Sequence, residues 1–477
     1  MSSPASIRTR MAPSPTGEYH IGHIRTLLYN FALAHQSAGQ FIIRIEDTDQ
    51  KRFVIGAQDR ILQVIKDYGL SWDEGPDIGG PYSPYVQSER LNIYQKYLKQ
   101  LLDSGQAYYC FCTEDRLTEM RDLQKASGKL PKYDRHCLSL SPAEVQKNLE
   151  AGLPYVVRLR IPDRETIVIE DLVRGKIKFN TNDVDDQVLV KSNGIPTYHF
   201  AAAVDDHLMN ITHILRGDEW ISSVPKLYTI YKYLDWELPK LAHLPVFLDP
   251  SGQGKMSKRK GTVSARSFLD DGYLPEALLN FLMLLGWNPG TEQELFSLDE
   301  FVKEFKIEKL HVKQPIFDRK KLDYFNGLYI REKITEAKYL EYFKKFLPEA
   351  SDEQVKILAP ILRSRLVKFS DLKTSLAFIF DDIKYDKELL LKKGTSPELA
   401  KEMLTKSINL LSTDFSDLVS RIQNLVSENS WNVGEFFMVF RVAICGVAFT
   451  PPVVDCLPAL GQESTLRKLN LALKNLI

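Results

Sequence analysis

The sequence predicts an α/β fold, in which a doubly wound parallel sheet carries an α+β insertion and is followed by an all-α C-terminal bundle. Apolar and β-branched runs, such as residues 7–12 and 40–45, alternate with helical patterns in the first half of the chain. From Asn326 onward, apolar residues recur every three or four positions, which is typical of packed helices. Helix-start signals support this, because segment 351–354 has the pattern of a capping box and Ser396 precedes a proline.

The remaining elements of the first half follow in order. Helical periodicity covers residues 55–68 and 87–104. The insertion combines polar helical residues at 114–153 with β-like runs at 155–161, 167–172 and 176–179. Strand character returns at 187–191 and 210–216, and a helix opens at 195–200 between these runs. The parallel sheet is therefore expected to continue after the insertion.

Composition is that of an ordinary globular chain with several domains. Hydrophobic residues make up 44% and charged residues 26% of the sequence, and 477 residues are too many for one core. The lack of a long apolar run or an apolar signal sequence predicts a cytoplasmic protein without membrane contact. Five cysteines, an odd number, indicate a reducing compartment rather than a disulfide framework. Because Lys plus Arg equals Asp plus Glu, nucleic-acid contact would need local basic patches.

The first strand, turn and helix are the stretch most indicative of function. Residues 7–12 precede a Pro-Ser-Pro-Thr-Gly turn and a helical pattern that continues to His35. Such a turn lies at the carboxyl end of a parallel strand, where ligands bind, and it points free helix N–H groups at an anion. His20 and His23, placed around Gly22 at the helix start, predict contacts with nucleotide phosphates. For these histidines alone, an ordinary surface loop is the alternative.

A second candidate phosphate-binding segment lies about half the chain later. Residues 255–259, Lys-Met-Ser-Lys-Arg, follow a glycine-rich turn at 251–254. Three cations and a hydroxyl on such a loop can neutralise charge that develops in a transition state. A solvated basic loop is the alternative for this segment alone, but the two segments together favour a nucleotide site.

Nine ordered motifs resemble those of one enzyme family. In chain order they are RMAPSPTG, HIGH, RIEDTD, EGPD, QSER, PTYHFA, VDDHLM, RGDEW and KMSKRK. HIGH and KMSKR are similar to the signatures of class I aminoacyl-tRNA synthetases, and the whole series resembles bacterial-type glutamyl-tRNA synthetase. The resemblance implies a Rossmann-like domain that activates glutamate with ATP and Mg²⁺ and transfers it to the 3′ end of tRNA(Glu). It also implies a monomer, and it leaves open whether tRNA(Gln) is charged.

The resemblance divides the chain into five segments. They are 1–112, the first half of the catalytic domain; 113–186, the α+β insertion that binds the acceptor end; 187–250, the second half of the catalytic domain; 251–325, the KMSKS loop and stem-contact region; and 326–477, the all-α anticodon-binding domain. In the last segment, Arg363 and Arg365 align best with the arginine that reads the last anticodon base. An ordinary exposed helical arginine is the alternative for either residue.

The resemblance also implies the site residues. ATP would contact Pro13, Gly17, His20, Gly22, His23, Glu219, Lys255, Ser257, Lys258 and Arg259, with His20, His23, Lys255 and Lys258 as the catalytic residues. Glutamate would contact Arg10, Ala12, Ser14, Glu46, Tyr198 and Arg216. Two arginines and a tyrosine hydroxyl suit a carboxylate side chain, because a guanidinium fork binds carboxylates through two hydrogen bonds. One departure is Ala202, where many relatives carry Asn.

Three of the five cysteines lie close together in the sequence. Cys110, Cys112 and Cys137 predict a thiolate metal site, with zinc as the ion, and zinc prefers four ligands. Related enzymes carry a further ligand two residues after the third cysteine, where this chain has Ser139, a poor ligand. His136 or Tyr133 could replace it, and reduced buried thiols without a metal are the alternative.

Three other functions compete with a complete synthetase. A truncated relative that glutamylates a modified tRNA base would lack the helical half, and a pantetheine-type nucleotidyltransferase would be far shorter. A non-catalytic RNA-binding paralogue would have the same fold. The intact HIGH and KMSKR motifs favour an enzyme over that paralogue.

Overall fold

The computed structural model describes residues 6–252, 254, 256, 263–383, 387–391 and 395–476. The chain forms two compact units. Unit 1 comprises Met1–Ser267 and Leu279–Asp318, and unit 2 comprises Phe268–Leu278 and Arg319–Ile477. The chain passes between the units three times: within α8 (Ala265–Asp270), within α9 (Pro275–Met283), and between Asp318 and Arg319.

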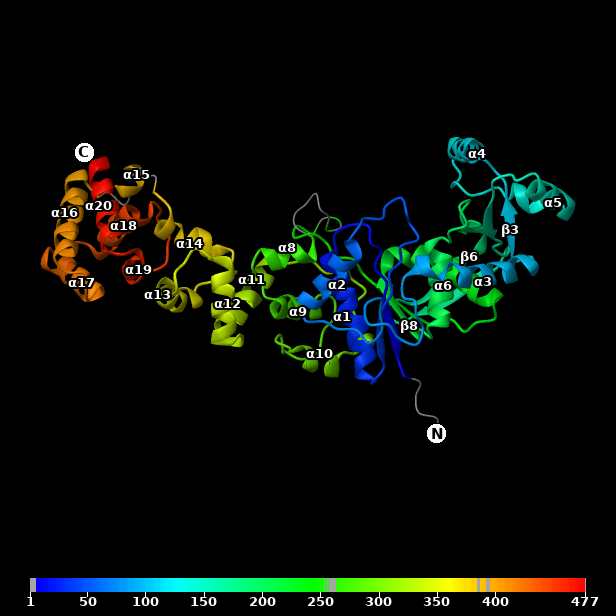
Figure 1. The fold of residues 1–477 in the computed structure, drawn as a ribbon, viewed down its shortest axis with the longest axis horizontal. Coiled ribbons are helices and arrows are strands. Elements are labelled where there is room, and N and C mark those ends of the chain that lie inside the picture. The colour runs from blue at the N-terminus through cyan, green and yellow to red at the C-terminus, as the bar shows by residue number, and fades with distance from the viewer. Residues whose placement is uncertain are drawn as a thin grey trace. The chain divides into compact units, whose positions relative to one another are not determined.

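Parallel strands build the centre of unit 1 (Figure 1). β1 (Arg8–Met11) pairs with β2 (Gln40–Ile43), and β8 (His213–Gly217) pairs with β9 (Lys240–Leu244). The backbone N–H of Thr212, just before β8, donates to the carbonyl of Arg8, which brings the two pairs edge to edge. The carboxyl ends of these strands therefore meet at one edge, where ligands of such sheets bind.

Helices cover both faces of these strands, as expected for a doubly wound sheet. α1 (Ile21–Gln36) packs on β1, β2 and β8. α3 (Leu91–Asp103), α6 (Tyr198–Leu208) and α7 (Val224–Tyr233) share a separate core with Ile42, Ile214 and Leu241 of the strands. Unit 1 also contains α2 (Ala57–Asp67), α10 (Leu298–Glu304) and short 3₁₀ turns at Gln87–Arg90, His136–Ser139, Thr181–Asp183, Asp218–Ser223 and Ile307–Lys309.

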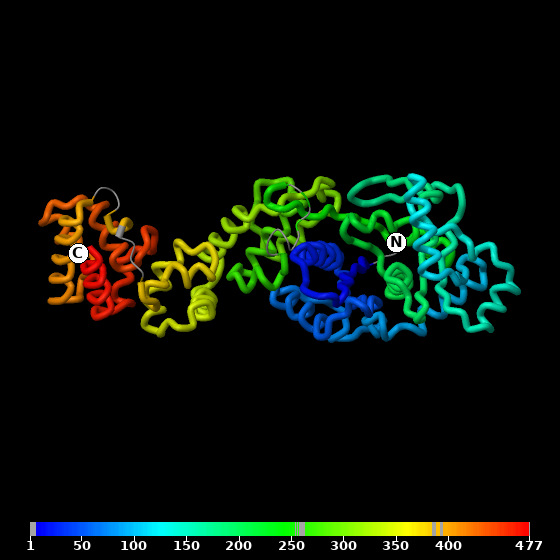
Figure 2. Tube along the Cα trace, turned by 90° about the horizontal axis from the view of Figure 1, so that it is seen from above, coloured from blue at the N-terminus to red at the C-terminus, as the bar shows by residue number. Residues whose placement is uncertain are grey.

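The insertion contributes to two sheets. β5 (Thr166–Asp171) pairs in parallel with β9 and carries β6 (Gly175–Asn180) antiparallel at its edge. β3 (Ala107–Cys110), β4 (Val156–Leu159) and β7 (Val188–Val190) form a separate antiparallel sheet. Beside it lie α4 (Glu114–Ala126) and α5 (Pro142–Glu150), at one end of unit 1 and cyan in Figure 2. Segment 113–186 thus holds strands of the central sheet as well as strands of its own.

The described residues of unit 2 form helices and no strand. The helices are α11 (Arg319–Leu328), a π-helical turn (Tyr329–Lys333), α12 (Glu336–Phe346), α13 (Asp352–Arg363), α14 (Asp371–Phe380), α15 (Lys387–Leu390), α16 (Pro397–Thr413), α17 (Leu418–Glu428), α18 (Val433–Cys445), α19 (Val453–Leu460) and α20 (Gln462–Leu476). Ser351 and Gln354 form the predicted capping box, and the Ser396 hydroxyl accepts from the N–H of Leu399.

The predicted fold class is confirmed: an α/β sheet domain with an insertion, followed by an all-α half. Among the helices of the described ranges, none is long and apolar enough to cross a membrane.

Candidate active site

A cavity of about 700 Å³ opens at the carboxyl ends of β1, β8 and β9. The structure brings most of the predicted ligand-contacting residues together in its lining: Arg10, Ala12, Pro13, Ser14, His20, Gly22, His23, Glu46, Tyr198, Arg216 and Glu219. Gly17 lies instead at a neighbouring cavity of about 210 Å³, which shares Pro13, Ser14 and His23. Residues from five separate stretches of sequence therefore converge on one cavity.

The histidine turn has the geometry of a phosphate-binding helix start. His20 is the N-cap of α1, and its Nδ1 accepts a hydrogen bond from the Gly22 N–H at 2.9 Å. Because Nδ1 accepts, the proton of the neutral ring sits on Nε2, which is then a donor. A Cβ at position 22 would lie 3.0 Å from the His20 ring and 3.6 Å from Phe247. Glycine at this position therefore keeps the helix start open.

Lys255, Ser257, Lys258 and Arg259 lie outside the described residues, but Met256 within their segment reaches the cavity, and the residues that follow the segment contact the histidine turn. Met256 lines the cavity and donates its backbone N–H to the Phe247 carbonyl at 3.1 Å. After the segment, the carbonyl of Val263 accepts a hydrogen bond from the N–H of Ile21, at the start of α1, at 2.8 Å. Ser264 forms an isolated antiparallel β-bridge with His20. The chain that follows the basic segment thus lies beside the histidine turn.

Two buried charges of opposite sign face the cavity without full compensation. Arg216 is 9% exposed, and its Nη2 has no hydrogen-bond partner among the described residues. Burial lowers the pKa of Arg216. Glu46 is 2% exposed; its Oε1 accepts from Arg44 at 2.9 Å, whereas its Oε2 has no partner within the described part of the chain. Burial raises the pKa of Glu46 to about 7.

Arg10 differs from Arg216 because its fork is already occupied. Its Nε and Nη2 donate to the two carboxylate oxygens of Asp206 at 2.9 and 3.2 Å, and both residues are buried. Asp206 also pairs with Arg44 at 2.8 Å. The sequence gives no reason to distinguish the two arginines. In the structure, Arg10 has only Nη1 left for a ligand.

A buried ion network supports the floor of the cavity. Three arginines and three carboxylates take part: Arg10, Arg44 and Arg90 with Glu46, Asp205 and Asp206. The two aspartates are adjacent on α6, and sequence reasoning did not assign them a role. A pair of acidic residues in an otherwise apolar helix was the available signal, because buried carboxylates require cationic partners. Arg216 has no salt-bridge partner among the described residues.

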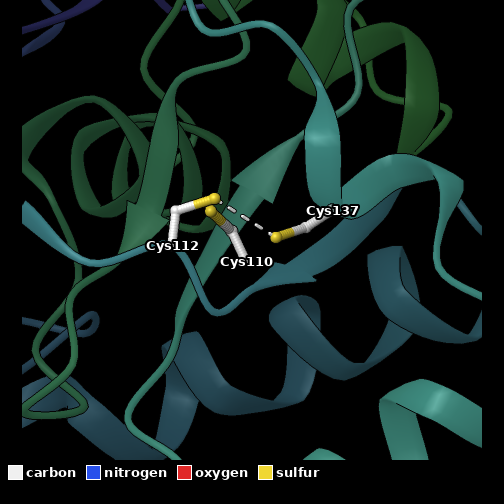
Figure 3. Close-up of side chains that lie close together, drawn as sticks. All are labelled: Cys110, Cys112 and Cys137. Atoms are coloured by element: carbon white, nitrogen blue, oxygen red, sulfur yellow. Dashed lines mark hydrogen bonds between the residues drawn. The ribbon is translucent and has the colours of Figure 1, made fainter. Parts of the chain in front are cut away.

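The three cysteines converge as predicted (Figure 3). The sulfurs of Cys110, Cys112 and Cys137 lie within 4.8 Å of one another, and the Tyr133 hydroxyl is 3.3 Å from Cys110 Sγ and 3.4 Å from Cys112 Sγ. A hydrogen bond from Cys137, together with those from Tyr133 and Arg158, lowers the pKa of Cys110 below that of an ordinary thiol. Ser139 is exposed, and its hydroxyl donates to a backbone carbonyl. Three thiols and a phenol oxygen therefore form a four-donor set suited to a tetrahedral cation.

In unit 2 the two candidate anticodon arginines differ. Arg363 donates from Nε to the Ile330 carbonyl at 3.1 Å and from Nη2 to the Ile334 carbonyl at 2.7 Å, and Nη1 pairs with Glu336. Arg365 is exposed, and its guanidinium forms no hydrogen bond or ion pair with other described residues. Arg363 therefore ties helices together, whereas Arg365 is available to a ligand.

Comparison with known proteins places this chain in a class. Residues 6–324 match the family model of the catalytic domain of class I tRNA synthetases (E and Q), and residues 338–473 match an anticodon binding domain. The protein is a class I tRNA synthetase. Glutamate–tRNA ligases of Clostridioides difficile (strain 630) and Clostridium tetani are 40% and 41% identical to it; the alignments cover 99% and 98% of this chain and 100% and 98% of those proteins.

A solved structure agrees with these relatives. The crystal structure of a glutamate tRNA ligase from Elizabethkingia meningosepticum in complex with its amino acid superimposes with a TM-score of 0.85 at 36% identity, covering 99% of this chain and all of that one. This chain belongs to the glutamate–tRNA ligase family, which confirms the resemblance carried by the nine motifs.

Proposed function

We propose that this protein is a glutamate–tRNA ligase that activates glutamate with ATP and transfers the glutamyl group to the 3′ end of tRNA(Glu). The observation that carries the proposal is a pair of buried charged groups, each with one polar atom that lacks a hydrogen-bond partner among the described residues, in one cavity with the histidine turn. Arg216 suits a side-chain carboxylate, and Glu46 suits an α-ammonium group. A zwitterion with an acidic side chain satisfies both charges, whereas a neutral amino acid leaves Arg216 unpaired.

The chemistry needs no protein nucleophile. The α-carboxylate of glutamate attacks the α-phosphorus of ATP in line, pyrophosphate leaves, and the terminal ribose hydroxyl of the tRNA then displaces AMP from the glutamyl carbonyl. Catalysis is therefore positioning plus charge stabilisation. His20, His23 and the N–H groups at the start of α1 hold phosphates, and Lys255 and Lys258 meet the departing pyrophosphate. Mg²⁺ bound with ATP would neutralise phosphate charge.

Aminoacylation with separate tRNA(Glu) and tRNA(Gln) transcripts tests the proposal. We expect glutamate and ATP to charge tRNA(Glu), and the second transcript shows whether tRNA(Gln) is also a substrate. Pyrophosphate exchange that depends on glutamate separates the enzyme from a non-catalytic RNA-binding paralogue. A protein that binds tRNA(Glu) but neither exchanges pyrophosphate nor charges the tRNA would overturn the proposal. As a translation enzyme, it is expected to act in the cytoplasm as a monomer.

The first prediction concerns the pH dependence of glutamate binding. Because burial raises the pKa of Glu46 to about 7, this residue is mostly protonated at pH 6 and mostly ionised at pH 8. Only the ionised carboxylate pairs with the α-ammonium group, so KM for glutamate should fall about tenfold between these pH values. Glu46→Gln should have a high KM at both. A KM in the native enzyme that is independent of pH, measured alongside KM for ATP as a reference, would contradict this role.

The second prediction separates the two arginines of unit 2. Arg365→Ala should lower kcat/KM for tRNA(Glu) by about tenfold or more through loss of one charged hydrogen bond to a base, without changing thermal stability. Arg363→Ala should instead lower the melting temperature, because three contacts between helical segments are lost. If Arg365→Ala charges tRNA(Glu) normally, Arg365 does not read the anticodon.

The third prediction concerns zinc at the cysteine cluster. We propose that Cys110, Cys112 and Cys137 hold Zn²⁺, with the Tyr133 oxygen as the fourth donor. Metal analysis of the purified protein should find about one zinc ion per chain, and Cys137→Ala should lose it. Cys445→Ala is the matched control, because burial raises the pKa of that thiol to about 12 and it lies in unit 2. Zinc-free native protein would refute the site.

A further inference from the structure

We propose that His243 and Asp171 are positioning residues that aim Arg216 at the substrate without forming a direct ion pair with it, and thereby set the preference for an acidic amino acid. The inference rests on the proposed function, in which Arg216 binds the side-chain carboxylate of glutamate. Neither residue lines the cavity, so both act through Arg216.

Three neighbouring strands place the residues in a row. Arg216 on β8 lies directly opposite His243 on β9 in the parallel register, and Asp171 ends β5, the next strand. Arg216 Nε donates to His243 Nε2 at 3.1 Å, and His243 Nδ1 contacts Asp171 Oδ2 at 2.6 Å. His243 is 1% and Asp171 2% exposed, so water cannot replace these contacts.

The hydrogen-bond partners fix the protonation of the histidine. An arginine Nε is only a donor, so His243 Nε2 must accept and the ring proton must lie on Nδ1, from which it is donated to Asp171. The other carboxylate oxygen of Asp171 accepts the backbone N–H groups of Val173 at 3.0 Å and Arg174 at 2.9 Å, so the carboxylate cannot rotate freely. Burial also lowers the pKa of His243, which keeps the ring neutral. Arg216 thus has a fixed, uncharged acceptor at Nε.

An uncharged acceptor is what distinguishes Arg216 from Arg10. The fork of Arg10 meets a carboxylate, Asp206, which cancels its charge within the protein. The imidazole of His243 orients Arg216 without cancelling its charge, and Nη2 still lacks a partner among the described residues. Asp171 reaches Arg216 only through the imidazole, and Asp206 forms no ion pair with it among the described residues, so the direct ion-pair position at Nη2 is left for the ligand. Glutamate can form this ion pair, but the neutral amide of glutamine cannot.

Asp171→Asn tests the arrangement, because it should move the ring proton of His243 from Nδ1 to Nε2. The amide oxygen of Asn must stay with the N–H groups of Val173 and Arg174, so its NH₂ faces His243 Nδ1. That nitrogen then accepts, the ring proton moves to Nε2, and two N–H groups oppose each other between His243 and Arg216. We expect KM for glutamate to rise by about 10- to 100-fold, the range typical when a residue that orients a metal ligand is lost, with KM for ATP and tRNA unchanged.

Two substitutions of the histidine separate positioning from charge. His243→Gln retains an uncharged oxygen acceptor for Arg216 and should keep most of the preference for glutamate over glutamine. His243→Glu places a carboxylate against Arg216, cancels its charge and should lower that preference by at least about tenfold. Asp73→Asn is the matched control, because Asp73 also pairs with a histidine, His35, at 3.2 Å but on the surface.

The outcomes separate this inference from the proposed function. If the native protein does not charge tRNA(Glu) with glutamate, the proposed function fails. If it does, and Asp171→Asn has the glutamate KM of Asp73→Asn, the inference is overturned. Equal glutamate preference in His243→Gln and His243→Glu would also overturn it, and this comparison decides the matter even if Asp171→Asn does not fold.

Discussion

Arg216→Met should lower kcat/KM for glutamate in tRNA-dependent pyrophosphate exchange by about 30- to several thousand-fold. The side chain is buried, its Nη2 has no partner among the described residues, and the proposed ligand supplies the opposite charge. Methionine fills a similar unbranched volume, so the loss reports charge rather than a cavity. KM for ATP should change little, because we propose that the phosphates bind at the histidine turn and not at Arg216.

Two further variants make this result specific. Arg216→Lys keeps the charge but loses the fork and the contact with His243, so its activity should lie between that of Arg216→Met and that of the native enzyme. Arg160→Met changes an exposed arginine of the same unit and should behave as the native protein. If Arg216→Met matched Arg160→Met, the carboxylate of the substrate would bind elsewhere.

Local sequence determines much of the side of the site where we propose that phosphates bind. The turn from strand to helix, the N-cap histidine and the glycine between the histidines are all set by neighbouring residues, and the structure has each of them. Such features are accessible from sequence because turn chemistry and helix starts depend on a few adjacent positions. The sheet edge on which they lie also follows from the alternation of strands and helices.

The amino-acid side of the site depends on contacts between distant residues. Arg10 and Asp206 are 196 positions apart, and nothing in the sequence shows that this aspartate occupies one arginine and leaves Arg216 without such a partner. His243 and Asp171 come from strands that pair only in the folded chain. Sequence reasoning could thus find the residue types of the pocket, but not how their charges are balanced.

In the insertion, too, the sequence indicates which residues form strands but not which strands pair with each other. β5 and β6 follow polar helices in the sequence, yet β5 pairs with β9 of the central sheet. β7, which was expected to resume that sheet, pairs with β4 instead. Strand identity is a local property of apolar and β-branched residues, whereas the choice of partner strand depends on tertiary packing. The domain boundaries predicted from the sequence therefore remain a prediction.

Asp206→Ala should lower the free energy of unfolding of unit 1 by about 3–5 kcal/mol. Asp206 binds Arg10 and Arg44 within 3.2 Å, and all three residues are buried. Without this carboxylate, the buried guanidinium groups of Arg10 and Arg44 lose the negative charge that they share, which destabilises the folded state. Urea titration followed by tryptophan fluorescence measures the change, because Trp72, Trp220, Trp236 and Trp287 lie in unit 1 and Trp431 alone lies in unit 2.

Asp103→Ala provides the matched comparison, because it removes a carboxylate from an exposed pair with Lys99 on α3. Exposed pairs of this kind contribute at most about 0.5 kcal/mol, so its urea midpoint should remain near the native value. If Asp206→Ala shifted the midpoint no more than Asp103→Ala, the buried arginines would have other compensation. The fork of Arg10 would then not need Asp206, and the distinction between the two arginines, on which charge selection at Arg216 depends, would be lost.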